Sequence, residues 1–147
     1  MHGNVGSMTN ALVGTIAVAL VAMACGNSRK GNVQPAVVID SPASGDTVRG
    51  TAVHVALAAN GVELAPAAEE RAGTAHHHLF LDVDPGPLDQ KIPSGVTGII
   101  HLGRAQTEFH WDSVAPGPHR IIAILADWQH VPLPGAAADT VRFVVQP

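Results

Sequence analysis

The fold of this chain is decided by residues 74–84, Thr-Ala-His-His-His-Leu-Phe-Leu-Asp-Val-Asp. Their pattern predicts a β-strand, in which successive side chains point to opposite faces. One face is apolar enough to join a core and carries His77, Leu79, Leu81 and Val83. The other face carries His76, His78, Phe80 and Asp82. Its two imidazoles lie roughly 6.5–7 Å apart along the strand, so both rings can reach one metal ion.

The rest of the chain alternates short apolar segments with turn residues. Segments with a period of two cover residues 36–40, 51–59, 61–64, 99–102, 106–112, 119–126 and 139–145. Residues 65–73 predict one helical turn or a loop, and residues 85–98 predict a long connection. Many short strands with turn-rich connections favour an all-β fold, an immunoglobulin-like antiparallel β-sandwich spanning residues 36–147.

Composition narrows the class of protein. Of the 147 residues, 46% are hydrophobic and 14% are charged, which indicates a packed domain rather than a disordered polar chain. The formal net charge is −4 and no lysine-rich stripe occurs, which argues against a nucleic-acid partner.

The N-terminal region predicts export. An uninterrupted apolar run, residues 11–24, ends at the single cysteine, Cys25. Its length predicts a signal peptide over residues 1–24 rather than a membrane-spanning helix. The small residues before Cys25 resemble a bacterial lipobox, in which the cysteine is lipidated and residues 25–35 form a tether. Because Ala22 replaces the usual leucine and the start lacks Lys and Arg, an ordinary secretory signal cleaved near Ala24 stays open.

In both cases we expect an exported protein, either periplasmic or an outer-membrane lipoprotein held at the membrane by its lipid. A protein partner in the cell envelope is a further possibility.

Histidine is unusually frequent, with nine residues, and some stand where predicted strands meet loops. If the fold brings His101 and His130 next to His76 and His78, four imidazoles converge. The predicted metal ligands are therefore His76, His78, His101 and His130. Three residues are candidates to support them by hydrogen bonding: Asp127, Glu108 and His77. Two of these have plainer alternatives, since Glu108 suits an ordinary strand face and His77 a buried, hydrogen-bonded position.

The type of metal follows from the available ligands. All three methionines and the cysteine precede residue 26, so the predicted sandwich offers no sulfur ligand. This excludes a blue-copper centre, an iron–sulfur cluster and a soft Cu(I) site within one chain. Imidazole and carboxylate ligands suit Cu(II) or Zn(II), and Ni(II) is a less favoured alternative. Calcium prefers more oxygen ligands than this group of residues offers.

The other histidines have structural interpretations. His54 and His110 fit surface positions, and His119 follows a Pro-Gly turn where it would bond to the backbone. Asp82 and Asp84 are typical turn formers before Pro85. The histidine run itself has a plain alternative, a polar strand end without a metal.

Four ordered motifs carry a resemblance over residues 74–145. They are His-His-His-Leu-Phe-Leu-Asp, Ile-His-Leu-Gly-Arg-Ala-Gln-Thr-Glu, Pro-Gly-Pro-His-Arg-Ile and Ala-Asp-Trp-Gln-His-Val-Pro. The series resembles a family of small exported bacterial proteins known as a domain of unknown function, some labelled rod-shape-determining. The resemblance implies motif positions at His76, His77, His78, His101, Gln106, Thr107, Glu108, His119, Asp127 and His130. The chain departs at Ile99, Trp128 and Leu133, where many members would have histidine.

Three functions compete. The first is a histidine-rich envelope protein that binds Cu(II) or Zn(II). The second is a non-catalytic immunoglobulin-like interaction or structural module. An enzyme is the least favoured, because the chain lacks a Gly-x-Ser-x-Gly elbow, a catalytic cysteine and a His-Glu-x-x-His helix.

Overall fold

The computed structural model describes residues 2–3 and 33–147. The predicted signal peptide, apart from residues 2–3, and the predicted lipidation site at Cys25 lie outside the described residues. In the described part of the chain, no helix has the length and apolar character needed to cross a membrane.

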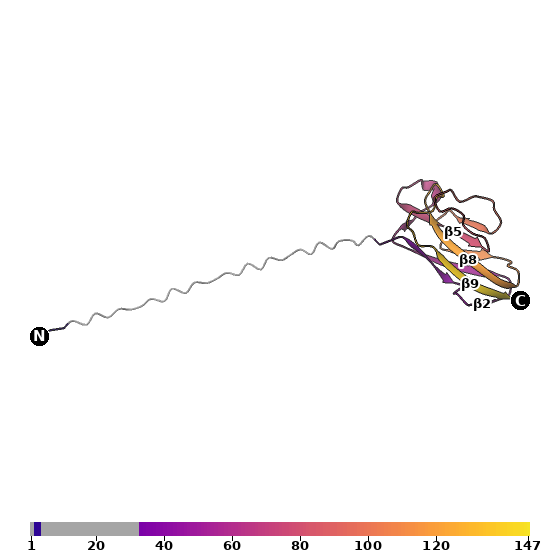
Figure 1. Ribbon diagram of the computed structural model, residues 1–147, viewed down its shortest axis with the longest axis horizontal. Coiled ribbons are helices and arrows are strands. Elements are labelled where there is room, and N and C mark those ends of the chain that lie inside the picture. The colour runs from indigo at the N-terminus through magenta and orange to yellow at the C-terminus, as the bar shows by residue number, and fades with distance from the viewer. Residues whose placement is uncertain (1, 4–32) are drawn as a thin grey trace.

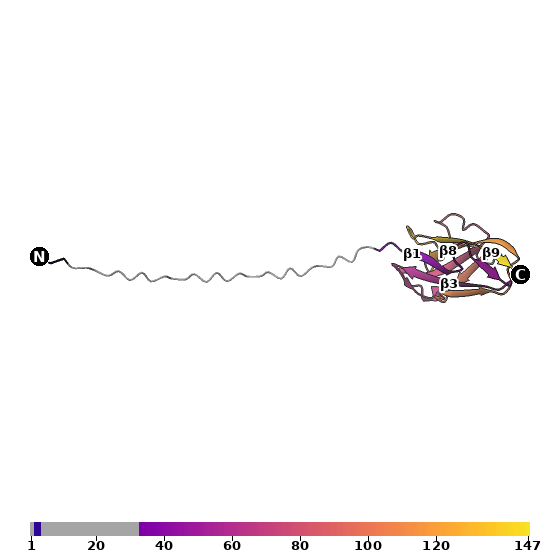
Figure 2. The same cartoon turned by 90° about the horizontal axis from the view of Figure 1, so that it is seen from below.

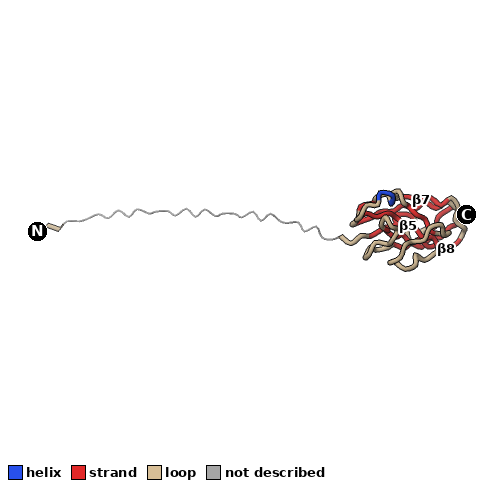
Figure 3. Tube along the Cα trace, turned by 90° about the horizontal axis from the view of Figure 1, so that it is seen from above, coloured by secondary structure: helices blue, strands red, loops and turns tan. Residues whose placement is uncertain are grey.

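Residues 33–147 form short strands and a single turn of 3-10 helix, as Figure 3 shows. The elements are β1 (Ala36–Ser41), β2 (Thr47–Arg49), β3 (Val53–Asn60), β4 (Glu63–Leu64), η1 (Ala67–Glu69), β5 (Thr74–Leu81), β6 (Ile99–Leu102), β7 (Glu108–Trp111), β8 (Gly117–Ala126) and β9 (Asp139–Gln146). The predicted strands are present, with ends that differ by a few residues. Only β2 was not predicted, because three residues are too short to show a period of two.

The strands form two sheets. The smaller has the order β1-β3-β7, and the larger has the order β2-β9-β8-β5-β4, with β6 also paired to β5. Figure 1 shows β5, β8, β9 and β2 side by side, and Figure 2 shows β1 beside β3. This confirms the predicted immunoglobulin-like β-sandwich. Two short pairs, β2 with β9 and β4 with β5, run parallel instead of antiparallel.

The main core lies between the sheets and uses the alternate residues of each strand. It contains the inward faces of β3, β8 and β9, among them Val55, Ile121 and Phe143. Small β-branched and aliphatic residues dominate it. On β5, Ala75 and Leu79 belong to this core and Leu81 packs against it, so the predicted core face points inward up to Leu81. The prediction was wrong for Val83, which follows the end of β5 and packs against the second cluster.

The opposite face of β5 is buried as well. Phe80 packs in a second cluster with Ile92, Ile124 and Ala126. Ile92 belongs to the connection 85–98, and its backbone N–H donates to the carbonyl of His130 at 2.9 Å. The long connection therefore covers the outer face of β5, the face that also carries His76 and His78.

A charged pair joins the end of β5 to β8. Asp82 has a φ of 59°, and this left-handed conformation ends the strand. The Asp82 carboxylate accepts hydrogen bonds from His119 Nδ1 at 2.6 Å and from the Arg120 backbone N–H at 2.8 Å. His119 Nε2 donates to the Ala115 carbonyl at 2.7 Å. Since both ring nitrogens face acceptors, the geometry suits an imidazolium. Burial lowers the pKa of His119, but the bonds to Asp82 and Ala115 outweigh it, and the pKa is raised overall.

We predict that His119→Gln lowers the free energy of unfolding by about 1 kcal/mol at pH 5 and by less at pH 9. A histidine whose pKa is raised by folding stabilises fully below its unfolded pKa, near 6.5, and loses this contribution as pH rises through the folded value. Urea unfolding at both pH values measures the difference. Asp84→Asn is the matched control, because Asp84 bonds to Arg120 and touches no imidazole. An equal loss for His119→Gln at both pH values would contradict the charged pair.

Candidate metal centre

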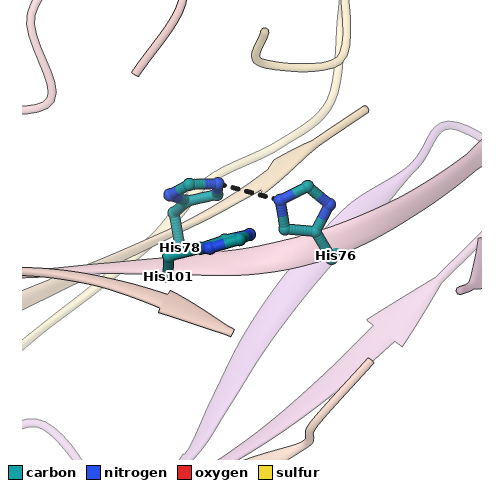
Figure 4. Close-up of side chains that lie close together, drawn as sticks. All are labelled: His76, His78 and His101. Atoms are coloured by element: carbon teal, nitrogen blue, oxygen red, sulfur yellow. Dashed lines mark hydrogen bonds between the residues drawn. The ribbon is translucent and has the colours of Figure 1, made fainter. Parts of the chain in front are cut away.

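The outer face of β5 carries two candidate ligands and receives a third from the neighbouring strand. His78 lies directly opposite His101 in the antiparallel pairing of β5 with β6. Their rings stack with centroids 5.0 Å apart. His76 lies two residues earlier on the same face, and its Nε2 is 3.0 Å from Nε2 of His78. Figure 4 shows these three rings gathered over β5.

The fourth ring comes from the loop after β8. Asp127 shapes this loop, because its carboxylate accepts from the backbone N–H groups of Gln129 and Val131 at 2.9 and 3.0 Å. His130 has a φ of 67°, in the left-handed region, which turns the chain back toward β5. Its Nε2 lies 3.2 Å from Nε2 of His101.

The structure therefore brings together all four histidines that we selected as ligands. The centroids of every pair among the four rings lie between 4.6 and 5.8 Å apart. We call His76, His78, His101 and His130 the four-histidine cluster. They come from three separate segments, so their meeting is a product of the tertiary fold.

Burial keeps the inner rings of the cluster neutral. His76 and His78 are 1% and 2% exposed, His130 is half-buried and His101 is exposed. Burial, followed by repulsion from His101 and His130, lowers the pKa of His76 to about 4. Burial, followed by repulsion from the other three rings, lowers the pKa of His78 to about 2. At pH 7 these rings therefore present lone pairs, the form that binds a metal.

Ligand nitrogens of His76, His78 and His101 all lie within 4.8 Å of one another, so these three rings could hold a metal ion, and His130 adjoins them through His101. Two nitrogens on a tetrahedral metal at about 2.0–2.1 Å lie about 3.3 Å apart, close to the observed 3.0 and 3.2 Å. These distances also suit N–H···N hydrogen bonds. Nδ1 of His78 is buried without a hydrogen-bond partner in the described residues. Because Nε2 is the nitrogen of His78 that faces the other rings, a cation in the cluster would not satisfy this Nδ1.

Two hollows give access to the cluster. One of about 250 Å³ is lined by His78, His101 and His130 together with the connection around Lys91 and Ile92. A larger one, of about 710 Å³, reaches His101 and His130 from the side of η1 and Trp128. A cation can thus enter from the side of the two less buried rings.

Gly103 makes room for the ring of His101. A Cβ at this position would overlap Cε1 and Nε2 of that ring. Gly103 was not among the predicted site residues, although it stands in the Ile-His-Leu-Gly motif. Ile92 was not predicted either, because an apolar residue inside a Pro- and Gly-rich connection carries no periodic signal.

None of the three candidate supporting residues bonds to a ring of the cluster, and for His77 and Glu108 the plainer alternatives agree with the structure. Asp127 bonds to loop backbone and not to a ring nitrogen, so it positions His130 through the loop. His77 points to the opposite face of β5, where Nδ1 donates to the Gln106 carbonyl at 3.0 Å. Glu108 belongs to β7 of the other sheet, where its carboxylate lies 3.7 Å from His54. Sequence alone does not assign β7 to a sheet, which is why Glu108 was misplaced.

We predict that Gly103→Ala drives the ring of His101 out of the cluster. Burial and repulsion from His130 lower the pKa of His101 in the native chain, so the pKa should rise toward the ordinary 6.5 in the variant. An NMR titration of the histidine rings measures this change, and the ring of His119 is the internal control. An unchanged pKa of His101 in a folded variant would show that Gly103 does not set the position of the ring.

No curated protein matches the sequence. Fibronectin(III)-like modules of Clostridium thermocellum CbhA have a TM-score of 0.46 and 17% identity, covering 75% of this chain and 95% of theirs. The PKD domain of human KIAA0319 has a TM-score of 0.40 and 15% identity, covering 83% and 90%. An engineered protein has a TM-score of 0.48 and 16% identity, covering 79% of this chain and 21% of its own length.

A protein-family model matches residues 55–146, which include β5 to β9 and the whole four-histidine cluster. This confirms the resemblance drawn from the histidine motifs. The chain belongs to the family described as Domain of unknown function (DUF4399).

Proposed function

We propose that this protein binds one Cu(II) or Zn(II) ion in the four-histidine cluster and acts as an exported, lipid-anchored metal-binding protein. The observation that carries the proposal is the meeting of four imidazoles from β5, β6 and the loop after β8, two of them almost fully buried. Burying two polar rings outside the main core costs free energy, and coordination of a cation would offset that cost.

The ligand set supports a borderline divalent cation. Four imidazoles suit Cu(II) or Zn(II), and Cu(II) generally binds such nitrogen sites more tightly. Because the inner rings are neutral at pH 7, few protons have to leave when the metal binds. The non-catalytic interaction module is the function that remains if no metal binds.

We predict that the purified chain binds one equivalent of Zn(II) or Cu(II) at the four-histidine cluster. Loss of a supporting hydrogen bond typically weakens metal binding by about 10–100-fold. The double variant His76→Gln/His78→Gln loses two ligands, so its metal affinity should fall by more than this. His130→Gln should also weaken it. Isothermal titration calorimetry measures both effects, and a bound metal should raise the midpoint of thermal unfolding.

Two further changes sharpen this titration. All samples carry His2→Ala and Cys25→Ser, so that these two residues add no metal binding. His119→Gln is the control histidine, since its ring is bonded to Asp82 and Ala115. Wild-type-like binding by the His76/His78 double variant, or no binding by the parent chain at micromolar concentrations, would reject the proposal.

Export and lipid attachment are tested separately. We expect the chain, expressed in a bacterium with an outer membrane, to incorporate labelled palmitate and to fractionate with membranes. Cys25→Ser should abolish both, since the thiol is the predicted attachment point. Unlabelled protein in the periplasm would indicate an ordinary secretory signal, and protein retained in the cytoplasm would contradict export.

A further inference from the structure

A second group of potential ligands lies on the three-stranded sheet. His54 on β3 stands directly opposite His110 on β7, and Glu108 is opposite Ala56, the next residue of β3 on the same face. The neighbouring residues Val53, Val55, Phe109 and Trp111 pack into the core, so these three polar side chains share the outward face. None of them belongs to the four-histidine cluster, which lies on the other sheet.

The three side chains are already close to one another. The rings of His54 and His110 stack with centroids 4.4 Å apart, and Nε2 of His54 lies 3.7 Å from the Glu108 carboxylate. One ligand atom from each residue can be chosen so that all three lie within 4.8 Å of one another. Ligands of one tetrahedral cation lie about 3.3 Å apart, so only small side-chain rotations are needed.

Solvent exposure allows these rotations. The side chains of His54 and Glu108 are 43% and 64% exposed, and Ala56 beside them is too small to block their movement. Two imidazoles and one carboxylate form a ligand set that protein zinc sites use with water in the fourth position. The carboxylate also neutralises part of the charge of the cation.

We propose that His54, Glu108 and His110 form a second divalent-metal site that binds Cu(II) or Zn(II) and leaves at least one position to water. It binds more weakly than the four-histidine cluster, because its ligands are exposed and their side chains lose rotational freedom on binding. The site does not depend on the proposed function, since the two groups of ligands lie on different sheets and share no residue.

The two tryptophans of the chain give each group its own reporter. Trp111 follows His110 on β7, whereas Trp128 lines the larger hollow together with His101 and His130. In a Trp128→Phe variant, Trp111 is the only tryptophan. Its side chain packs on the core side of β7, and Cu(II) bound on the outward face at the adjacent residue His110 should still be near enough to quench its emission. In a Trp111→Phe variant, Trp128 instead reports the four-histidine cluster.

The experiment titrates CuCl₂ into the full chain carrying Trp128→Phe, His2→Ala and Cys25→Ser. We expect saturable quenching of Trp111 that His54→Gln with His110→Gln removes, that Glu108→Gln weakens, and that His76→Gln with His78→Gln leaves in place. Glu63→Gln is the matched control, an exposed carboxylate that pairs with Arg71. Circular dichroism confirms that each variant is folded.

Several outcomes would overturn the second site. Quenching that persists without His54 and His110, or that disappears with His76 and His78, would assign the signal elsewhere. Absence of saturation at micromolar Cu(II) would also reject the site. If Cu(II) quenches Trp111 in the Trp128→Phe variant but does not quench Trp128 in the Trp111→Phe variant, the proposed function is rejected and the second site stands.

Discussion

The structure depends on burial of β5 on both faces. Its inward side chains join the core between the sheets, whereas the outward ones are covered by the connection 85–98 and by the loop after β8. Without these covering segments, His76 and His78 would be hydrated residues on the surface of the strand, and their imidazoles would have the ordinary histidine pKa. With these segments, burial keeps both imidazoles neutral and presses their nitrogens together. The chemistry of the cluster therefore comes from the covering segments as much as from the histidines.

Two accounts of the buried rings remain physically distinct. Without a metal, His76 can pair with His78 and His101 with His130 through two N–H···N hydrogen bonds, because one ring of each pair donates and the other accepts. A cation would instead occupy ring lone pairs that protons would otherwise take. Both arrangements leave Nδ1 of His78 unpaired, because Nε2 is the nitrogen of that ring that faces the cluster. The free energy of binding a cation decides between them.

Much of the fold follows from local patterns, and much of the site does not. Period-two alternation is enough to find β3, β8 and β9, and it places His76 and His78 on one face. Whether His101 joins them depends on the register of β6 on β5, which pairs His78 with His101. The association of His54 with Glu108 depends likewise on the register of β7 on β3. Such registers are set by tertiary packing between distant segments, so single-strand patterns could not assign Glu108 to its sheet.

The two groups of ligands differ in solvation more than in chemistry. The inner rings of the cluster, His76 and His78, are buried, whereas His54, Glu108 and His110 are exposed on the outward face of β3 and β7. A buried ligand set is already ordered before the metal arrives, so it loses little side-chain entropy and releases the cation slowly. An exposed set has to be ordered by the cation and exchanges it quickly. A metal bound in the cluster would therefore leave slowly, whereas one bound at His54, Glu108 and His110 would exchange rapidly with solution. This difference follows from burial alone and holds for either Cu(II) or Zn(II).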